Sequence, residues 1–169
     1  MKKNAQAKGF TLIELLIYIA ILVTFLVTVV MFMHQLLGAR VKHQVISEVE
    51  QQGLLISQMI GQTIRNAEAI TSPTIGTSAN AITIDVVDLA KDPTVFDLNG
   101  TTIQINEAGA GVIELNTTRV EASAVTFYNI SRVDTPGIIK YEFTLTYANP
   151  SNSKEYEYSK TFYGSAALR

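Results

Sequence analysis

The side chains that could perform chemistry are few, and they are unevenly placed along the 169 residues. The chain has no cysteine and two histidines, His34 and His43. Residues 70–169 therefore hold neither residue type, which excludes Ser-His-Asp and Cys-His catalysis and imidazole or thiolate zinc sites there. A hydrolase built on paired carboxylates is the one catalytic alternative left, and we consider it the weaker interpretation. We predict that the protein is not an enzyme.

Four aspartates in the second half of the chain are close in sequence: Asp85, Asp88, Asp92 and Asp97. They could bind Ca²⁺, but their spacing does not match the D-x-[DN]-x-[DN]-G loop, which favours a solvated loop. We predict no metal and no cofactor. Three N-glycosylation triplets begin at Asn99, Asn116 and Asn129; such triplets arise by chance in a chain rich in threonine and asparagine, and we assign them no function.

One carboxylate lies beside a long apolar run. Glu14 directly precedes Leu15–Met33, which reads LLIYIAILVTFLVTVVMFM and carries no charge. A carboxylate at this place costs about 2–3 kcal/mol unless it reaches the interface or finds a partner. Glu14 is therefore a functional candidate, with simple snorkelling as the alternative.

The apolar run itself predicts a membrane-spanning helix. As a helix its 19 residues extend roughly 28 Å, close to the thickness of the bilayer core. Lys2, Lys3 and Lys8 precede it, which favours a cytoplasmic N-terminus. A secretory signal peptide would have a shorter core and a small-residue cleavage site. A plain membrane anchor explains the length and the lysines, but not Glu14.

The segment Lys8–Leu16, KGFTLIELL, resembles the processing and assembly motif of type IV prepilins and type II secretion pseudopilins. The resemblance implies cleavage after Gly9 by a prepilin peptidase and N-methylation of Phe10, the new N-terminus. It also implies that Glu14, the fifth mature residue, pairs with the N-terminal amine of a neighbouring subunit. Such a pair is physically sound, because two opposite charges in lipid cost least together and a buried pair can set the register of assembly.

Beyond the apolar run, the spacing predicts an amphipathic continuation of the same helix. The expected apolar face contains Leu37, Val41, Val45, Val49, Ile56, Met59, Ile60 and Ile64. Spacings of three, four and seven residues are typical of one helix face. We expect one helix from about Phe10 to about Ala69, whose second half covers a sheet. A coiled-coil partner for that face remains an alternative.

The remainder, residues 71–169, is predicted to be a β-rich head. Expected strands are 81–87, 101–106, 111–116 and 125–130, with turns at Asn99-Gly100 and 107–111. Residues 139–147 alternate apolar and polar side chains, and the chain returns through Tyr156, Tyr158 and Phe162, which predicts a hairpin. We expect its tyrosines to serve packing rather than ligand binding. The layout is similar to minor pseudopilins of type II secretion (J type) and W-type minor pilins.

These observations predict an α+β fold, a pilin-like lollipop in four parts: a leader at 1–9, a transmembrane helix at 10–35, its amphipathic continuation at 36–70 and the head at 71–169. Many major pilins have a proline within the hydrophobic segment, and its absence at 29–32 leans towards a minor pilin. Without the leader the chain has 10 basic and 15 acidic residues (13 − 3 = 10), which speaks against a nucleic-acid partner.

The predicted function is that of a structural subunit, a minor pilin or pseudopilin of a type IV pilus-like filament or type II secretion pseudopilus. Its partners would be other pilin or pseudopilin subunits, the prepilin peptidase/methyltransferase and, before assembly, the inner membrane. The predicted location is the prokaryotic cell membrane, with the head periplasmic or extracellular, and then the filament. Two alternatives stay open: a surface adhesin or ligand-binding module delivered by a pilin leader, and a single-span membrane protein that never enters a filament.

Overall fold

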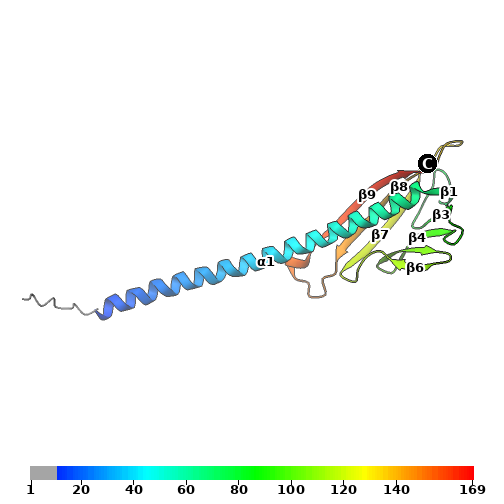
Figure 1. The fold of residues 1–169 in the computed structure, drawn as a ribbon. Coiled ribbons are helices and arrows are strands. Elements are labelled where there is room, and N and C mark those ends of the chain that lie inside the picture. Colours follow the sequence, from blue (N-terminus) through cyan, green and yellow to red (C-terminus); the bar gives the residue numbers. More distant parts are fainter. Residues whose placement is uncertain (1–10) are drawn as a thin grey trace, which may run out of the picture. The chain divides into compact units, whose positions relative to one another are not determined.

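The computed structural model describes residues 11–169. Helix α1 (Leu12–Arg65) is followed by nine strands and one short 3₁₀ helix, η1 (Lys154–Tyr156), in this part of the chain (Figure 1). The strands are β1 (Ala67–Ser72), β2 (Ser78–Ala79), β3 (Ile82–Val86), β4 (Thr94–Asn99), β5 (Thr102–Glu107), β6 (Gly111–Glu114), β7 (Val120–Asn129), β8 (Ile138–Tyr147) and β9 (Ser159–Ala167).

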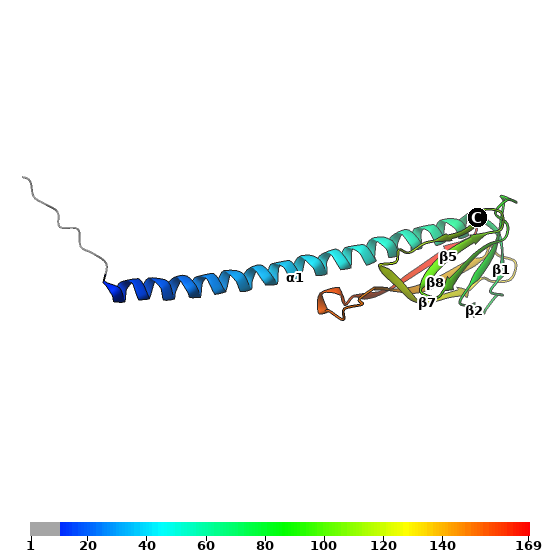
Figure 2. The same ribbon diagram turned by 90° about the horizontal axis from the view of Figure 1, so that it is seen from below.

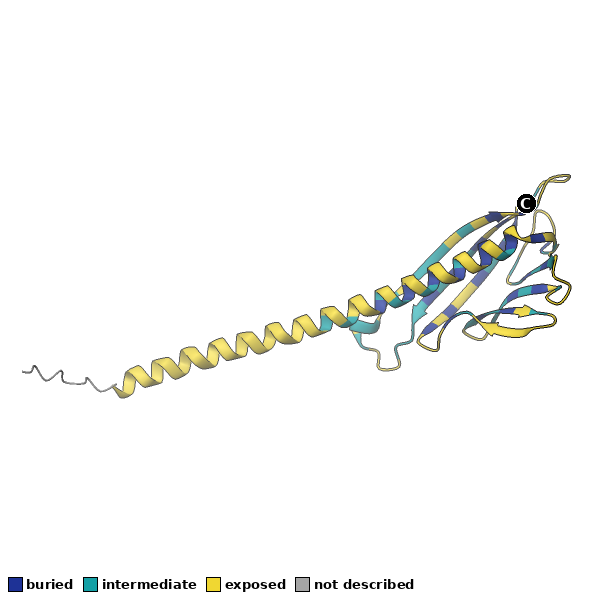
Figure 3. Ribbon diagram, in the orientation of Figure 1, coloured by how far each residue is buried: buried dark blue, intermediate teal, exposed yellow. Residues whose placement is uncertain are grey.

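The chain divides into two compact units, residues 1–40 and 41–169. In the first unit, the described part of α1 is exposed almost throughout, and its large apolar side chains are covered by nothing (Figure 3). In the second unit, one face of α1 is buried in the head: Val45, Val49, Ile56, Ile60 and Ile64 are at most 2 % exposed. The second half of the helix thus packs as its 3.6-residue periodicity predicts.

The strands of the head form two antiparallel sheets (Figures 1 and 2). The five-stranded sheet has the order β1-β3-β4-β5-β6, and the four-stranded sheet has the order β2-β7-β8-β9. Buried side chains of both sheets and of α1 make one apolar cluster, which includes Phe96, Phe127 and Phe143. A long apolar helix packed on an antiparallel β head confirms the predicted α+β, pilin-like fold.

The predicted C-terminal hairpin is formed by β8 and β9, with Phe143 opposite Phe162. Alternate residues of β8 point into the core, where Tyr141 is 3 % and Phe143 1 % exposed. Phe143 and Phe162 stack with their ring centroids 5.3 Å apart. The aromatic residues of β8 therefore serve packing, as alternation predicts, whereas Tyr163 on the opposite face of β9 is exposed.

Two glycines let aromatic rings approach the backbone closely. The ring of Phe162 covers Gly53 of α1, and a Cβ added there would lie 2.1 Å from the ring. The ring of Tyr141 covers Gly164 of β9 in the same way. Tyr141 also donates a 2.8 Å hydrogen bond to the Ser57 carbonyl of α1. These contacts fix α1 on the four-stranded sheet.

The helix differs from expectation at two points. It ends at Arg65, not at about Ala69, because Ala67–Ser72 pairs with β3 and the sheet supplies its backbone hydrogen bonds. Leu37 and Met59 were expected on the buried face, but they are 57 % and 44 % exposed. Their positions on the helix lie to the side of the row that contains Ile56 and Ile60.

Strand β4 was not predicted. Its apolar residues alternate, with Phe96 fully buried, but the sequence around it is dominated by aspartates and a proline. The expected turns on either side of β5 are both present, since Asn99 pairs with Thr102 and Glu107 with Gly111. Gly100 has φ +62°, a conformation that glycine adopts without strain.

Candidate functional site

The N-terminal site predicted from the sequence is only partly described by the structure. Gly9 and Phe10 lie outside the described residues. Thr11 is the first described residue, and α1 begins directly after it. The backbone N–H of Glu14 donates to the Thr11 carbonyl at 3.1 Å and lies 3.4 Å from the Thr11 hydroxyl oxygen. Thr11 and Glu14 have the spacing of a capping box, which fixes where the helix starts.

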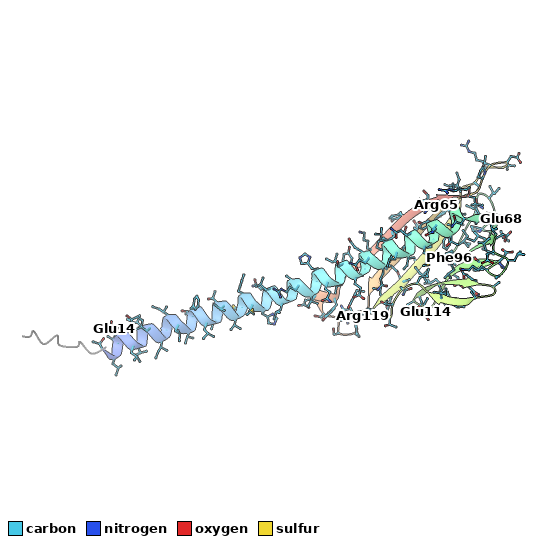
Figure 4. The ribbon with its side chains drawn as sticks, viewed as in Figure 1. Glu14, Arg65, Glu68, Phe96, Glu114 and Arg119 are labelled. Carbon is cyan, nitrogen blue, oxygen red and sulfur yellow. The ribbon has the colours of Figure 1, made fainter. Side chains whose placement is uncertain are left out.

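Glu14 lies in the first helical turn among exposed apolar side chains (Figure 4). Leu12 is 80 % and Leu15 54 % exposed. Within residues 11–169 Glu14 makes no ion pair, and the next charged residue along the chain is Arg40. The first turn of a helix favours a negative charge. The site thus places one carboxylate in an apolar setting, which is costly unless a cation or the membrane interface compensates the charge.

The helix that follows Glu14 is suited to lipid. Among the described residues, α1 is the one helix that is long and apolar enough to cross a membrane. Its two central threonines satisfy their hydroxyls locally: Thr24 donates to the Ala20 carbonyl at 3.0 Å, and Thr28 donates to the Thr24 carbonyl at 2.8 Å. Hydroxyls bonded back to their own helix do not need water. The apolar helix fits a membrane-anchored, single-pass protein.

Comparison with known families agrees with this site. The sequence pattern of the prokaryotic N-terminal methylation motif matches residues 4–30, which include Gly9, Phe10 and Glu14. The match supports the type IV pilin-like family for this chain. No curated protein and no solved structure matches the chain. The N-terminal segment therefore carries a prokaryotic methylation motif, and the head must be interpreted from its own residues.

The acidic residues of the head do not gather into a cation site. Within residues 11–169 no three histidine, aspartate or glutamate side chains are placed to hold a metal ion. Asp85 accepts a hydrogen bond from the Thr71 hydroxyl, Asp88 from the Ala90 N–H and Asp92 from the Val86 N–H. The bond of Asp85 joins β1 to β3, whereas those of Asp88 and Asp92 stabilise the connection between β3 and β4. Asp97 lies apart on β4.

Two of the three glycosylation triplets begin at buried asparagines. Asn116 is 7 % and Asn129 3 % exposed. Asn116 accepts from the Ile103 N–H and donates to two carbonyls. Asn129 donates to the Pro73 carbonyl at 2.7 Å. Both side chains join neighbouring segments of the head, a role that the local sequence does not reveal.

A polar cluster joins the C-terminal hairpin to α1. The ammonium of Lys160 lies 2.8 Å from the Glu50 carboxylate, and the Tyr158 hydroxyl donates to the same oxygen. The hydrogen bond from Lys160, together with its charge, lowers the pKa of Glu50. The hydrogen bond to Glu50 raises the pKa of Lys160, and burial raises that of Tyr158.

One surface feature of the head, a groove, was not predicted from the sequence. The groove, of about 600 Å³, lies between the end of α1, from Leu55 to the residue Asn66 that follows the helix, and the end of the five-stranded sheet. We call it the α1 groove. Its far wall is formed by Val86, Val87, Asp88, Lys91, Thr94 and Glu107. Lys91 and Glu107 pair across this wall at 3.1 Å. No local sequence pattern indicates this groove, because the helical periodicity placed Met59 on the buried face and only the structure shows Met59 exposed.

Proposed function

We propose that this protein is a structural subunit of a type IV pilus-like filament or of a type II secretion pseudopilus, namely a minor pilin or pseudopilin. The observation that supports it best is the methylation motif at residues 4–30, followed directly by an exposed apolar helix. The role is non-enzymatic. The subunit acts by packing its helix against other subunits, while the head at residues 71–169 remains outside the membrane.

In this proposal the leader, residues 1–9, is removed after Gly9, and Phe10 becomes a methylated N-terminus. The apolar segment holds the subunit in the membrane with its N-terminus cytoplasmic until assembly. The new amine is a positive charge in an apolar setting, and Glu14 of a neighbouring subunit is the carboxylate that neutralises it. Pairing lowers the cost of both charges and fixes how far one helix slides along the next.

Intact-mass and N-terminal analysis of the protein purified from its native membrane tests the processing step. The proposal expects a chain that begins at methylated Phe10. A chain that still begins at Met1, in cells with an active prepilin peptidase, would contradict the proposal and favour a simple anchored protein.

Substitution at Glu14 tests the assembly step. Glu14→Val should leave cleavage intact but reduce recovery in the filament fraction by roughly thirtyfold or more, because an unpaired amine in lipid costs about 2–3 kcal/mol. Glu14→Gln keeps the size of the side chain and removes its charge, so it should fail similarly, whereas Glu14→Asp should retain part of the assembly. Normal incorporation of Glu14→Val would refute the role of the carboxylate.

A surface adhesin or ligand-binding module is the second candidate. The specific observation in its favour is a set of exposed apolar side chains on the head, including Leu89 and Val133. If the head binds a target outside the cell, purified filaments that carry these residues as alanine should lose that binding without losing assembly. Equal binding by both forms would remove the support for this candidate.

A further inference from the structure

The wall of the α1 groove at the end of the helix carries three amides. Gln58 and Gln62 are four residues apart and so lie on one side of α1, roughly 6 Å apart along its axis, and Asn66 follows directly after the helix ends. Their side chains make no hydrogen bond within residues 11–169. They are available to a partner as both donors and acceptors.

The same groove exposes large apolar side chains. Leu55 is 63 % and Met59 44 % exposed on the helical wall, and Val87 on the opposite wall is 71 % exposed. Leu89, two residues further on, is 86 % exposed. Apolar surface with a polar rim marks an interaction site. A wholly apolar occupant would leave the three amides without partners, so the occupant must present both apolar and polar groups.

The far wall of the groove is negatively charged. Its charged residues are Asp88, Glu107 and Lys91, which gives a net charge of one negative unit (2 − 1 = 1). Lys91 and Glu107 pair with each other, so Asp88 is the carboxylate of this wall without an ion-pair partner within residues 11–169. Asp88 lines the groove itself. A positively charged occupant should therefore associate faster with the groove and be oriented by its charge.

One segment of the chain has the matching chemistry. Residues 36–43, LLGARVKH, are helical and combine Leu36 and Leu37, 42 % and 57 % exposed, with Arg40 and Lys42 and no acidic residue. We propose that the α1 groove binds this segment of a second copy of the chain, as a helix laid into a groove. This inference rests on the proposed function, since it supplies one of the contacts between assembled subunits.

Cysteine crosslinking tests the contact without background, because the full-length chain has no cysteine of its own. Two differently tagged copies are expressed together, one with Val87→Cys in the groove and the other with Leu37→Cys in the segment. Both positions are more than half exposed, so neither change disturbs the core. A short bismaleimide is applied to native membranes and to the filament fraction, and dimers that carry both tags are measured.

The matched control replaces Val87→Cys by Val133→Cys, which is 75 % exposed on a loop outside the groove. We expect the groove pair to give several-fold more mixed dimer than the control pair. Asp88→Asn, which keeps an acceptor for the Ala90 N–H, should lower that yield about two- to fivefold, the range that an exposed ion pair supports. An unchanged yield would overturn the charge-guided contact.

The outcomes separate this inference from the function on which it rests. Equal yields from the groove pair and the control pair would overturn docking in the groove. So would the absence of mixed dimers from chains that are cleaved after Gly9 and recovered in filaments, while the proposed function would stand. Absence of mixed dimers, of cleavage and of filaments together would overturn both.

Discussion

Removal of the Asn116 side chain should destabilise the head more than any exposed substitution. Asn116 accepts a 2.7 Å hydrogen bond from the Ile103 N–H, and it donates to the carbonyls of Thr101 and Val120. It is 7 % exposed, so Asn116→Ala leaves the Ile103 N–H without a partner and removes one bond from each carbonyl, although the Thr101 carbonyl keeps a bond from the Ala122 N–H. A buried donor without a partner costs about 1–3 kcal/mol, and each carbonyl loses a bond worth about 1 kcal/mol. We therefore expect a loss of about 3–5 kcal/mol.

Thermal unfolding of the full-length protein in detergent, followed by near-ultraviolet circular dichroism, measures this loss. Six of the seven tyrosines lie beyond residue 120 and there is no tryptophan, so the signal reports the head. For a chain of this size 1 kcal/mol corresponds to about 2–4 °C, which predicts a fall in Tm of about 10 °C.

The control is Asn99→Ala, in an exposed turn that begins with the same type of triplet; it should change the free energy of unfolding by less than about 1 kcal/mol. Asn116→Asp gives a second reading. Its carboxylate would face two carbonyls, so the native state should be weakened at neutral pH and partly recovered below the pKa of the new group. A Tm for Asn116→Ala within about 1 °C of the parent value would refute this account of the site.

Three further outcomes follow from the head. Gly53→Ala should cost about 1–3 kcal/mol, because its Cβ would lie 2.1 Å from the Phe162 ring, and Phe162→Leu in the same chain should recover part of that loss. The Glu50–Lys160 ion pair should stabilise the head only at pH values between the two pKa values. Because the pKa of Glu50 is lowered, the stabilisation is lost as the pH falls through that pKa. Because the pKa of Lys160 is raised, the stabilisation is lost as the pH rises through the pKa of Lys160. Lys160→Met should abolish this pH dependence in urea titrations. Excess chelator should leave Tm unchanged, and a fall in Tm would reveal a structural cation.

The parts of the molecule that could be predicted from the sequence are those with local causes. The length of the apolar run before His34 predicts a helix, and the strict alternation of apolar and polar residues predicts the strand β8. The processing motif occupies nine consecutive residues, Lys8–Leu16. Each of these patterns is complete within one element and needs no knowledge of what packs against it.

The parts that escaped prediction depend on residues far apart in the sequence. Ala67–Ser72 has helical neighbours on one side, and it becomes a strand because β3 pairs with it. The local sequence does not distinguish Asn116 from an exposed loop asparagine, and its burial follows from its hydrogen bonds to β5 and β7. The α1 groove forms because Gln58 and Val87 lie on facing walls, and the residue pattern of neither segment indicates that the two will lie near each other.

The two units make different demands on their surroundings. In residues 41–169 the apolar side chains are largely buried against each other, so the head carries its own core. In the described part of residues 1–40 they are exposed, and such a surface is stable only in lipid or against other helices. Substitutions in the two units should therefore have separable effects: Asn116→Ala lowers the stability of the head, whereas Glu14→Val changes which partners the helix accepts and leaves the Tm of the head where it was. A change at Glu14 that also lowered the stability of the head would contradict this separation.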